Sequence, residues 1–170
     1  MEKRQIAYLS LGSNVGDRAF NLAQAVRRIR QIPGTKVRAV SPVYETSPVD
    51  VTGGLFYNTV AIIETDRDPH ILMEDLHRIE SRMGRTRNDH GTAARNIDID
   101  LLLYGGYYIE EADLSLPHPR MIKRRFVMEP LADLAPDLWI PHAGCTASQM
   151  AFTLKESCPE QIVAKVGNLV

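Results

Sequence analysis

The sequence predicts an α+β fold, in which two helices pack on an antiparallel sheet of ferredoxin-like β-α-β-β-α-β order and a helical extension follows. Two observations predict it. Strand-like and helix-like hydrophobic patterns follow one another in that order, and Gly or Pro residues separate most of them. The chain has 170 residues, of which 44% are hydrophobic and 24% are charged, as is usual for one globular domain. We therefore expect residues 1–170 to form a single domain.

The first half of this pattern begins with residues 5–11, a continuous apolar run that predicts a buried strand ending at Gly12. Asp17 can cap a helix that extends to about Arg30, because apolar residues recur on one face of that segment. Residues 35–41 then alternate between apolar and basic side chains, which predicts a second strand.

The second half begins after Ser41–Gly54, a segment whose two prolines and two glycines predict a long loop. Residues 56–65 predict a third strand, and Asp68 with the proline after it predicts the start of a helix that ends at Gly84. The fourth strand is expected over 96–104.

The last third of the chain predicts a short helix near 123–134 and a final helix near 146–156. Residues 143–170 contain no motif, and the sequence assigns them no role.

Charge and hydropathy exclude several classes of protein. Twenty Lys and Arg residues nearly balance 21 Asp and Glu, so no overall field would recruit nucleic acid or a membrane surface. No apolar stretch is long enough for a signal peptide or a spanning helix. We expect a cytoplasmic protein with no nucleic-acid or membrane partner. A monomer is the expected state, with a weak dimer as the alternative that the sequence leaves open.

Asp98 and Asp100 are the sharpest chemical feature. In a strand they share one face about 6.6 Å apart, while Ile97, Ile99, Leu101 and Leu103 occupy the other face. Two carboxylates this close repel unless a cation, an arginine or a shared proton intervenes, and hard divalent ions are a common solution. The alternative is an ordinary amphipathic strand with a solvated acidic face, although aspartate is disfavoured in strands.

Basic residues gather around this acidic pair. Nine of the 20 lie between positions 78 and 125: Arg78, Arg82, Arg85, Arg87, Arg95, Arg120, Lys123, Arg124 and Arg125. Arginine suits phosphate oxygens, and magnesium usually binds together with phosphates. Arg78 and Arg82 fit a solvated helix surface better, whereas Arg85, Arg87 and Arg95 are in a loop that favours phosphate binding.

Seven short motifs occur in order along the chain. They are Leu11-Gly12-Ser13-Asn14-Val15-Gly16-Asp17, Tyr44-Glu45-Thr46-Ser47-Pro48, Phe56-Tyr57-Asn58, Ile79-Glu80 with Gly84-Arg85-Thr86-Arg87, Arg95-Asn96-Ile97-Asp98-Ile99-Asp100-Leu101-Leu102-Leu103-Tyr104-Gly105, Pro117-His118-Pro119-Arg120-Met121 and Arg124-Arg125-Phe126-Val127. In this order the chain resembles the 6-hydroxymethyl-7,8-dihydropterin pyrophosphokinases of folate biosynthesis, over roughly residues 5–142.

The resemblance implies transfer of pyrophosphate from ATP to the hydroxymethyl group of a reduced pterin, with AMP as the second product. It implies that Asp98 and Asp100 hold two Mg²⁺ ions, and that Arg85, Arg95 and Asp100 are the catalytic residues. The residues that would bind ATP are Glu80, Arg87, Arg95, Leu101, His118 and Arg124. Those that would bind the pterin are Thr46, Val49, Phe56, Asn58 and Phe126, the two phenylalanines enclosing its ring.

The sequence departs from some relatives at two positions. Thr92 stands where some members have a tryptophan, and Pro119 where others have a tyrosine. Both differences concern how loops would close over the site, and they leave the acidic and basic groups unchanged.

Two other functions share part of this pattern. A two-metal phosphohydrolase acting on nucleotides would use the same aspartates and arginines, but it has no need of Phe56, Asn58 and Phe126 together. A non-catalytic nucleotide-binding module of ferredoxin-like fold would bind ATP without releasing AMP.

Overall fold

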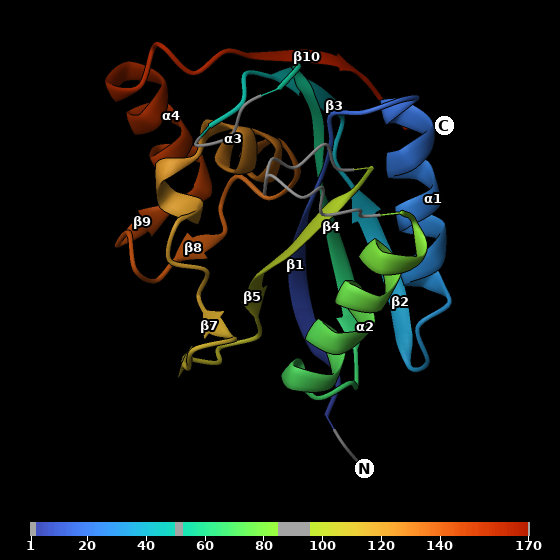
Figure 1. The fold of residues 1–170 in the computed structure, drawn as a ribbon. Helices are drawn as coiled ribbons and strands as arrows, with labels where there is room; N and C mark the ends of the chain where they lie inside the picture. The colour runs from blue at the N-terminus through green and yellow to red at the C-terminus, as the bar shows by residue number, and fades with distance from the viewer. Residues whose placement is uncertain (1–2, 50–52, 85–95, 170) are drawn as a thin grey trace.

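The computed structural model describes residues 3–49, 53–84 and 96–169, which contain a six-stranded sheet (Figure 1). The strands are β1 (Gln5–Ser13), β2 (Thr35–Val40), β3 (Val43–Thr46), β4 (Phe56–Thr65), β5 (Asp98–Tyr104) and β10 (Val163–Gly167). Their order is β10-β3-β4-β1-β5, and β2 also pairs with β4. All of these pairs are antiparallel, as the sequence predicts for the sheet.

Four α-helices lie within the described residues, together with a short 3-10 helix and two small hairpins. The helices are α1 (Arg18–Arg30), α2 (Pro69–Arg82), α3 (Arg125–Leu134) and α4 (Ala147–Ser157), with the 3-10 helix over Met121–Lys123. The hairpins pair β6 (Ile109–Glu110) with β7 (Ser115–Leu116) and β8 (Trp139–Ile140) with β9 (Cys145–Thr146).

The predicted caps set the beginnings of the first two helices. The carboxylate of Asp17 accepts a hydrogen bond from the Phe20 N–H at 3.0 Å, and that of Asp68 accepts one from the His70 N–H at 2.9 Å. Each cap satisfies one of the N–H groups that a helix N-terminus leaves without an intrahelical partner. Both helices therefore begin within a residue of the position that the sequence predicts.

Apolar side chains form two layers, one on each face of the sheet. On one face Leu22 of α1 and Leu76 of α2 pack with Leu9 of β1, and all three are fully buried. On the other face Met128 and Leu131 of α3 are equally buried, in a cluster that also includes residues of α4. The pattern explains why α1 and α2 lie on one side of the sheet in Figure 1, with α3 and α4 on the other.

Two strands of the six-stranded sheet, β3 and β10, were not expected from the sequence. β3 lies inside Ser41–Gly54, so the prediction that this whole segment is a loop is wrong. Only four residues long, β3 pairs with β4 on one side and β10 on the other. Strand formation at β3 and β10 therefore depends on pairing between distant segments rather than on a local hydrophobic pattern.

The pairing of β5 with β1 shifts register near the C-terminal end of β5. Leu9 pairs with Leu101 and Tyr8 with Leu103, which leaves Leu102 without an opposing residue, as in a β-bulge. The alternation therefore breaks, and Leu103 packs in the α3 side of the core, not on the face of Ile99 as the sequence predicts.

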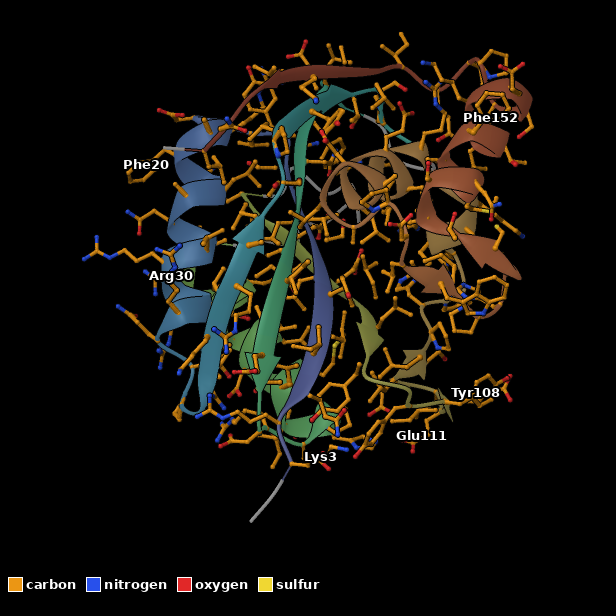
Figure 2. All side chains as sticks on the ribbon, turned by 180° about the vertical axis from the view of Figure 1, so that it is seen from behind. Lys3, Phe20, Arg30, Tyr108, Glu111 and Phe152 are labelled. Atoms are coloured by element: carbon orange, nitrogen blue, oxygen red, sulfur yellow. The ribbon has the colours of Figure 1, made fainter. Side chains whose placement is uncertain are left out.

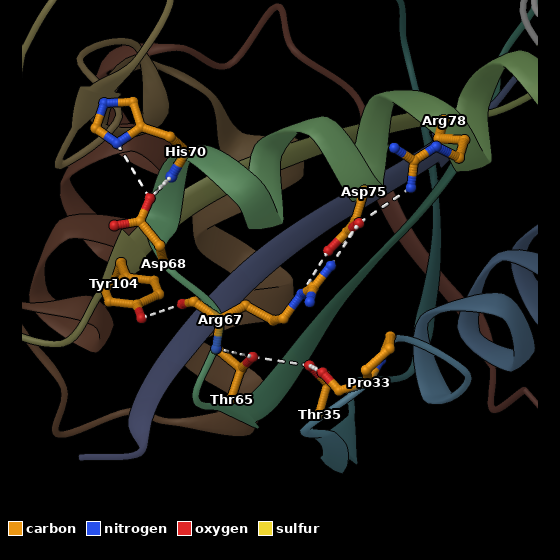
Figure 3. Close-up of polar contacts among 9 residues, drawn as sticks. All are labelled: Pro33, Thr35, Thr65, Arg67, Asp68, His70, Asp75, Arg78 and Tyr104. Atoms are coloured by element: carbon orange, nitrogen blue, oxygen red, sulfur yellow. Dashed lines mark hydrogen bonds and ion pairs between the residues drawn. The ribbon is translucent and has the colours of Figure 1, made fainter. Parts of the chain in front are cut away.

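A polar cluster fixes α2 to the end of the sheet (Figure 3). The carboxylate of Asp75, which is 6% exposed, accepts hydrogen bonds from Arg67 at 3.0 and 3.1 Å and from Arg78 at 3.3 Å. The Arg67 backbone N–H in turn donates to the Thr65 hydroxyl at 3.1 Å, and its carbonyl accepts from the Tyr104 hydroxyl. A buried carboxylate paired with two guanidinium groups in this way is structural, because its charge is compensated within the cluster.

Several large apolar side chains remain on the surface, such as Phe20, Tyr108 and Phe152, which project outward in Figure 2. In the part of the chain that the structure describes, we find no helix that is both long and apolar enough to cross a membrane.

Candidate active site

A pocket of about 230 Å³ opens where β1 ends and β4 and β5 begin, with α3 forming another wall. Its lining residues are Ser10, Gly12, Thr46, Ser47, Val49, Phe56, Asn58, Asp98, Asp100, His118, Arg120, Arg124 and Phe126. Polar and charged groups from distant segments thus converge on one cavity, as is typical of a small-molecule site.

The acidic pair enters this pocket because of strand alternation. In the pairing of β1 with β5, Asp98 is opposite Gly12 and Asp100 is opposite Ser10. These opposing residues are small, and they leave space in front of both carboxylates. Ile99, between the aspartates, is 1% exposed and faces the core, which confirms the predicted two faces for the part of the strand that precedes the bulge at Leu102.

Glu80 supports this segment from behind. It is 3% exposed on α2, and its Oε2 accepts a hydrogen bond from the Ile99 N–H at 2.9 Å. The bond joins helix α2 to the backbone between the two aspartates, which restricts the motion of both carboxylates.

The acidic pair has basic neighbours on the α3 side of the pocket. Arg124 Nη1 lies 3.8 Å from Asp100 Oδ2, and the Arg124 guanidinium lies 5.4 Å from the centre of the Phe126 ring. At 3.8 Å the ion pair is loose, so the guanidinium can turn toward an anion that enters the pocket.

The surroundings of His118 favour the neutral form of its ring. Burial lowers its pKa, Arg124 and Arg120 lower it further, and only Asp100 acts in the opposite direction. Its Nδ1 accepts a hydrogen bond from the Arg120 backbone N–H at 3.2 Å, so the proton of the neutral ring is on Nε2. Such a ring can donate one hydrogen bond from Nε2 to an oxygen or nitrogen acceptor.

The opposite side of the pocket presents polar groups that are fixed by one another. Asn58 and Thr46, 3% and 1% exposed, are joined by a hydrogen bond from Asn58 Nδ2 to Thr46 Oγ1 at 2.6 Å. Gly12 lies so close that a Cβ there would be 2.5 Å from Asn58 Oδ1. Phe56 of β4 and Phe126 of α3 add aromatic surface from two different elements.

The structure thus brings together nine of the residues singled out in the sequence. They are Thr46, Val49, Phe56, Asn58, Asp98, Asp100, His118, Arg124 and Phe126. Glu80 and Leu101 do not line the pocket, because Glu80 lies behind β5 and Leu101, 2% exposed, points into the core. Arg85, Arg87, Arg95 and Thr92 lie outside the described residues.

Four lining residues had no role assigned from the sequence: Ser10, Gly12, Ser47 and Arg120. Ser10 and Gly12 alternate with the fully buried Leu9 and Leu11 on β1. This alternation of small polar and apolar residues in an otherwise apolar strand is a signal that could have identified them.

The acidic pair fits a magnesium site that is completed by substrate. Within residues 3–49, 53–84 and 96–169, no three His, Cys, Asp or Glu side chains are arranged to hold a metal ion by themselves. Magnesium usually binds through one or two carboxylates, with phosphate oxygens and water as its other ligands. Asp98 and Asp100, with open space before them and arginine beside them, have the chemistry of such a pair.

Known proteins match this chain in both sequence and fold. The family model of the 7,8-dihydro-6-hydroxymethylpterin-pyrophosphokinases matches residues 8–136. The chain is 44% identical to a 2-amino-4-hydroxy-6-hydroxymethyldihydropteridine pyrophosphokinase of Methylorubrum extorquens, over 92% of this chain and 98% of that protein. It is 42% identical to the Bacillus subtilis protein of the same name, over 76% and 77% of the two chains.

Solved structures agree on the fold. The wild-type Plasmodium falciparum HPPK-DHPS with pteroate gives a TM-score of 0.77 at 15% identity, over 94% of this chain and 46% of that one. The same protein with SDX-DHP gives 0.76 at 16% identity, with the same coverage. The chain spans about half the length of these solved structures. The family model matches residues 8–136, and two relatives of the same name are 44% and 42% identical over most of the chain. These matches show that the chain belongs to the 7,8-dihydro-6-hydroxymethylpterin-pyrophosphokinase family.

Proposed function

We propose that the pocket is where this chain carries out the reaction of its family, transfer of pyrophosphate from ATP to the hydroxymethyl group of 6-hydroxymethyl-7,8-dihydropterin. The products are the pterin diphosphate and AMP. One observation carries the proposal: an acidic and basic cluster for phosphates and a polar, aromatic cluster for a flat heterocycle line the same cavity. Family membership supports it independently.

Asp98 and Asp100 would hold Mg²⁺, two ions in the reading that the family resemblance favours. When bound, the metal would offset the charge that moves onto the phosphate oxygens during transfer. By the family resemblance, Asp100 would also orient the substrate hydroxyl or accept its proton.

Arg124 and His118 would bind the nucleotide phosphates. The Arg124 guanidinium supplies a fork of N–H donors and a positive charge, and neutral His118 supplies one donor from Nε2. Pyrophosphoryl transfer depends mainly on in-line positioning and charge stabilisation, which fixed donors of this kind provide.

Asn58 and Thr46 would read the polar edge of the pterin, while Phe56 and Phe126 enclose its ring with Val49 beside them. Asn58 Nδ2 donates one of its two hydrogens to Thr46 Oγ1. The Asn58 carbonyl oxygen, its second amide N–H and the Thr46 hydroxyl proton are therefore the groups that can turn to the ligand. A stacked ring with a few fixed polar partners is the usual arrangement for a flat heterocycle.

The family resemblance supplies the remaining assignments. Arg85 and Arg95 would act in catalysis by neutralising phosphate charge, and Arg87 and Arg95 would bind ATP. Glu80 and Leu101 would contact the nucleotide from outside the described pocket lining, Leu101 through its backbone.

The same proposal extends to the architecture. We take β5-β1-β4-β2, with α1 and α2 as the connecting helices, as a ferredoxin-like core to which β3 and β10 are added. The chain would act as one domain of 170 residues, as a cytoplasmic monomer on two small-molecule substrates.

The test is to incubate the protein with ATP, Mg²⁺ and 6-hydroxymethyl-7,8-dihydropterin and to follow AMP and the pterin diphosphate by chromatography. We expect the two products in equal amounts, and none when the pterin is omitted. Release of ADP, or of phosphate without pterin, would favour a phosphohydrolase, and ATP binding without AMP would favour a binding module. Either outcome contradicts the proposal.

A further inference from the structure

The C-terminal segment lies against two walls of the pocket. Figure 1 shows β10 leaving α4 and running beside β3 toward the end of the chain near α1. In the pairing of β10 with β3, Val163 is opposite Thr46, one of the lining residues. The sequence assigns residues 143–170 no role, so the contacts of this segment require a separate explanation.

The first wall is bound through Ser47, another lining residue. The Ser47 N–H donates to the Ile162 carbonyl at 2.9 Å, and the Ile162 N–H donates to Ser47 Oγ at 2.8 Å. The Ile162 side chain is 60% exposed, so the backbone of this residue, not its side chain, makes the attachment. The two bonds fix Ser47 immediately before residues 48–49 and after Thr46.

The second wall is bound through the preceding residue, Gln161. Its Oε1 accepts a hydrogen bond from the Arg125 backbone N–H at 3.0 Å, and its Nε2 donates to the Lys123 carbonyl at 3.2 Å. These two backbone groups flank Arg124, and Phe126 follows directly. One side chain therefore holds the segment that carries two lining residues.

A buried guanidinium strengthens this second attachment. Arg125 is 7% exposed, its Nε donates to Glu129 Oε2 at 2.7 Å, and its Nη1 donates to the carbonyls of Cys158 and Gln161. Arg125 thus secures the backbone on both sides of residues 159–160, and hydrogen bonds from a charged donor are among the stronger ones.

A further set of bonds keeps β10 in register beside the pocket. Asp133 of α3 accepts the Tyr44 hydroxyl of β3 at 2.6 Å and the Lys165 ammonium of β10 at 2.8 Å. The three elements are therefore joined at two places, and Gln161 with Ile162 forms the place nearer the cavity.

We propose that Gln161 and Ile162 are positioning residues that set the distance between the Thr46–Ser47 wall and the Arg124–Phe126 wall of the pterin pocket. This inference rests on the proposed function, because it assigns the pterin to that pocket. A pocket whose walls are held before binding loses less entropy when ligand enters. Gln161 touches no substrate in this arrangement and acts through the walls that it joins.

The test compares Gln161→Ala, which removes both side-chain bonds, with Gln161→Glu, which keeps the acceptor for Arg125 N–H and loses the donor to Lys123. Glu160→Ala is the matched control, since Glu160 is exposed, adjacent and without a side-chain hydrogen bond among those the structure describes. Two quantities are measured in the full chain: exchange of the Ser47 amide proton by NMR without ligand, and the Kd for 6-hydroxymethylpterin by calorimetry, both without ATP and with a saturating non-hydrolysable ATP analogue and Mg²⁺. The Kd of a non-hydrolysable ATP analogue with Mg²⁺ is measured alongside.

We expect Gln161→Ala to speed Ser47 amide exchange about 10-fold, because the loss of both side-chain hydrogen bonds makes local opening of this segment easier. The pterin Kd should rise about 3- to 10-fold, because one or two side chains that are ordered in the free wild-type protein would become ordered only when the ligand binds. The ATP-analogue Kd of Gln161→Ala should change less, and its kcat at saturation should stay within about twofold of the wild-type value. The Ser47 exchange rate and the pterin Kd of Gln161→Glu should both lie between those of the wild type and Gln161→Ala.

Faster Ser47 exchange with an unchanged pterin Kd would overturn the positioning role and leave a purely structural one. Unchanged exchange in Gln161→Ala would overturn the proposed coupling of the two walls. Failure of the wild-type protein to bind the pterin even with the ATP analogue and Mg²⁺ present contradicts the proposed function instead, and amide exchange still decides the coupling, because it is measured without ligand.

Discussion

At the scale of single residues, the contribution of the β5 aspartates to catalysis can be tested without changing the stability of the fold. Both side chains face the pocket, and their removal opens no cavity in the apolar core. We expect Asp98→Ala and Asp100→Ala to lower kcat at least about 100-fold, because each removes a preorganised charge at the transferring phosphates. Rapid-quench measurement of AMP formation checks this. Asp137→Ala, at an exposed aspartate, serves as control and should keep wild-type activity.

The thermal midpoint of both variants should remain close to that of the wild type. An Asp98 or Asp100 variant that forms AMP within a few-fold of the wild-type rate would show that these carboxylates are not part of the catalytic site.

Gly12 provides a second test at this scale. A Cβ at this position would lie 2.5 Å from Asn58 Oδ1 and 3.6 Å from a ring carbon of Phe56. Asn58 cannot retreat without breaking its 2.6 Å bond to Thr46. We therefore expect Gly12→Ala to weaken pterin binding at least about 10-fold, as a displaced polar partner does in a buried site. Binding of an ATP analogue should change much less, and calorimetry measures both.

Gly106→Ala is the matched control for steric effects, because a Cβ there would have no heavy atom within 4 Å. If both glycine variants bind the pterin as the wild type does, Asn58 does not contact the ligand in the way we propose.

At the scale of elements, an exposed histidine attaches α2 to the β6–β7 hairpin. His70 Nε2 is 2.9 Å from Glu111 Oε2, and Nδ1 is 3.3 Å from Asp68 Oδ1. The hydrogen bond with Glu111 raises the pKa of His70, and Asp68 adds to the effect. Because the folded pKa is raised, the resulting stabilisation is complete below the unfolded pKa near 6.5 and is lost as pH rises through the folded value.

The free energy of unfolding of the wild type should thus fall slightly more between pH 6 and pH 8 than that of Glu111→Gln. NMR titration of the His70 ring should give a pKa above 6.5 in the wild type and a lower one in Glu111→Gln. Equal values in the two proteins would mean that the ring and Glu111 do not pair in solution.

The sequence predicted the helices and strands that are marked by a local pattern of apolar residues or by a capping residue. The strand over 56–65 and the helix from Pro69 were predicted almost to the residue, because alternation and capping residues mark them directly. β3 and β10 were missed, since each has few residues and depends on a partner far away in the chain. The bulge at Leu102 was also missed, because only the register with β1 reveals it.

The site was predicted in a similar way. Asp98 stood out because aspartate is disfavoured in a strand, whereas Phe126 was singled out only through the family resemblance. Ser10 and Gly12 were not, since their role is to leave space, which becomes visible only when β1 is paired with β4 and β5. Gln161 was missed because it acts through the backbone of other residues.

At the scale of the whole molecule, the sheet separates a layer that supports the fold from a layer that also carries a wall of the site. Leu76 of α2 and Leu131 of α3 are both fully buried, one in each layer. Truncation of a buried leucine to alanine costs about 2–5 kcal/mol of unfolding free energy, so both Leu76→Ala and Leu131→Ala should be destabilised by that amount. Of the two helices, only α3 contributes to the pocket lining, because it contains Phe126 and begins directly after Arg124.

The two variants should therefore differ in ligand binding although they are similarly destabilised. We expect Leu131→Ala to raise the pterin Kd several-fold, because a cavity beneath α3 allows that wall to move, and Leu76→Ala to leave it within about twofold. Denaturant unfolding measures the first effect. The increase in thermal midpoint with pterin concentration measures the second, since a ligand that binds the folded state stabilises it in proportion to ln(1 + [L]/Kd). Equal shifts for Leu76→Ala and Leu131→Ala would mean that the position of α3 does not control the pocket.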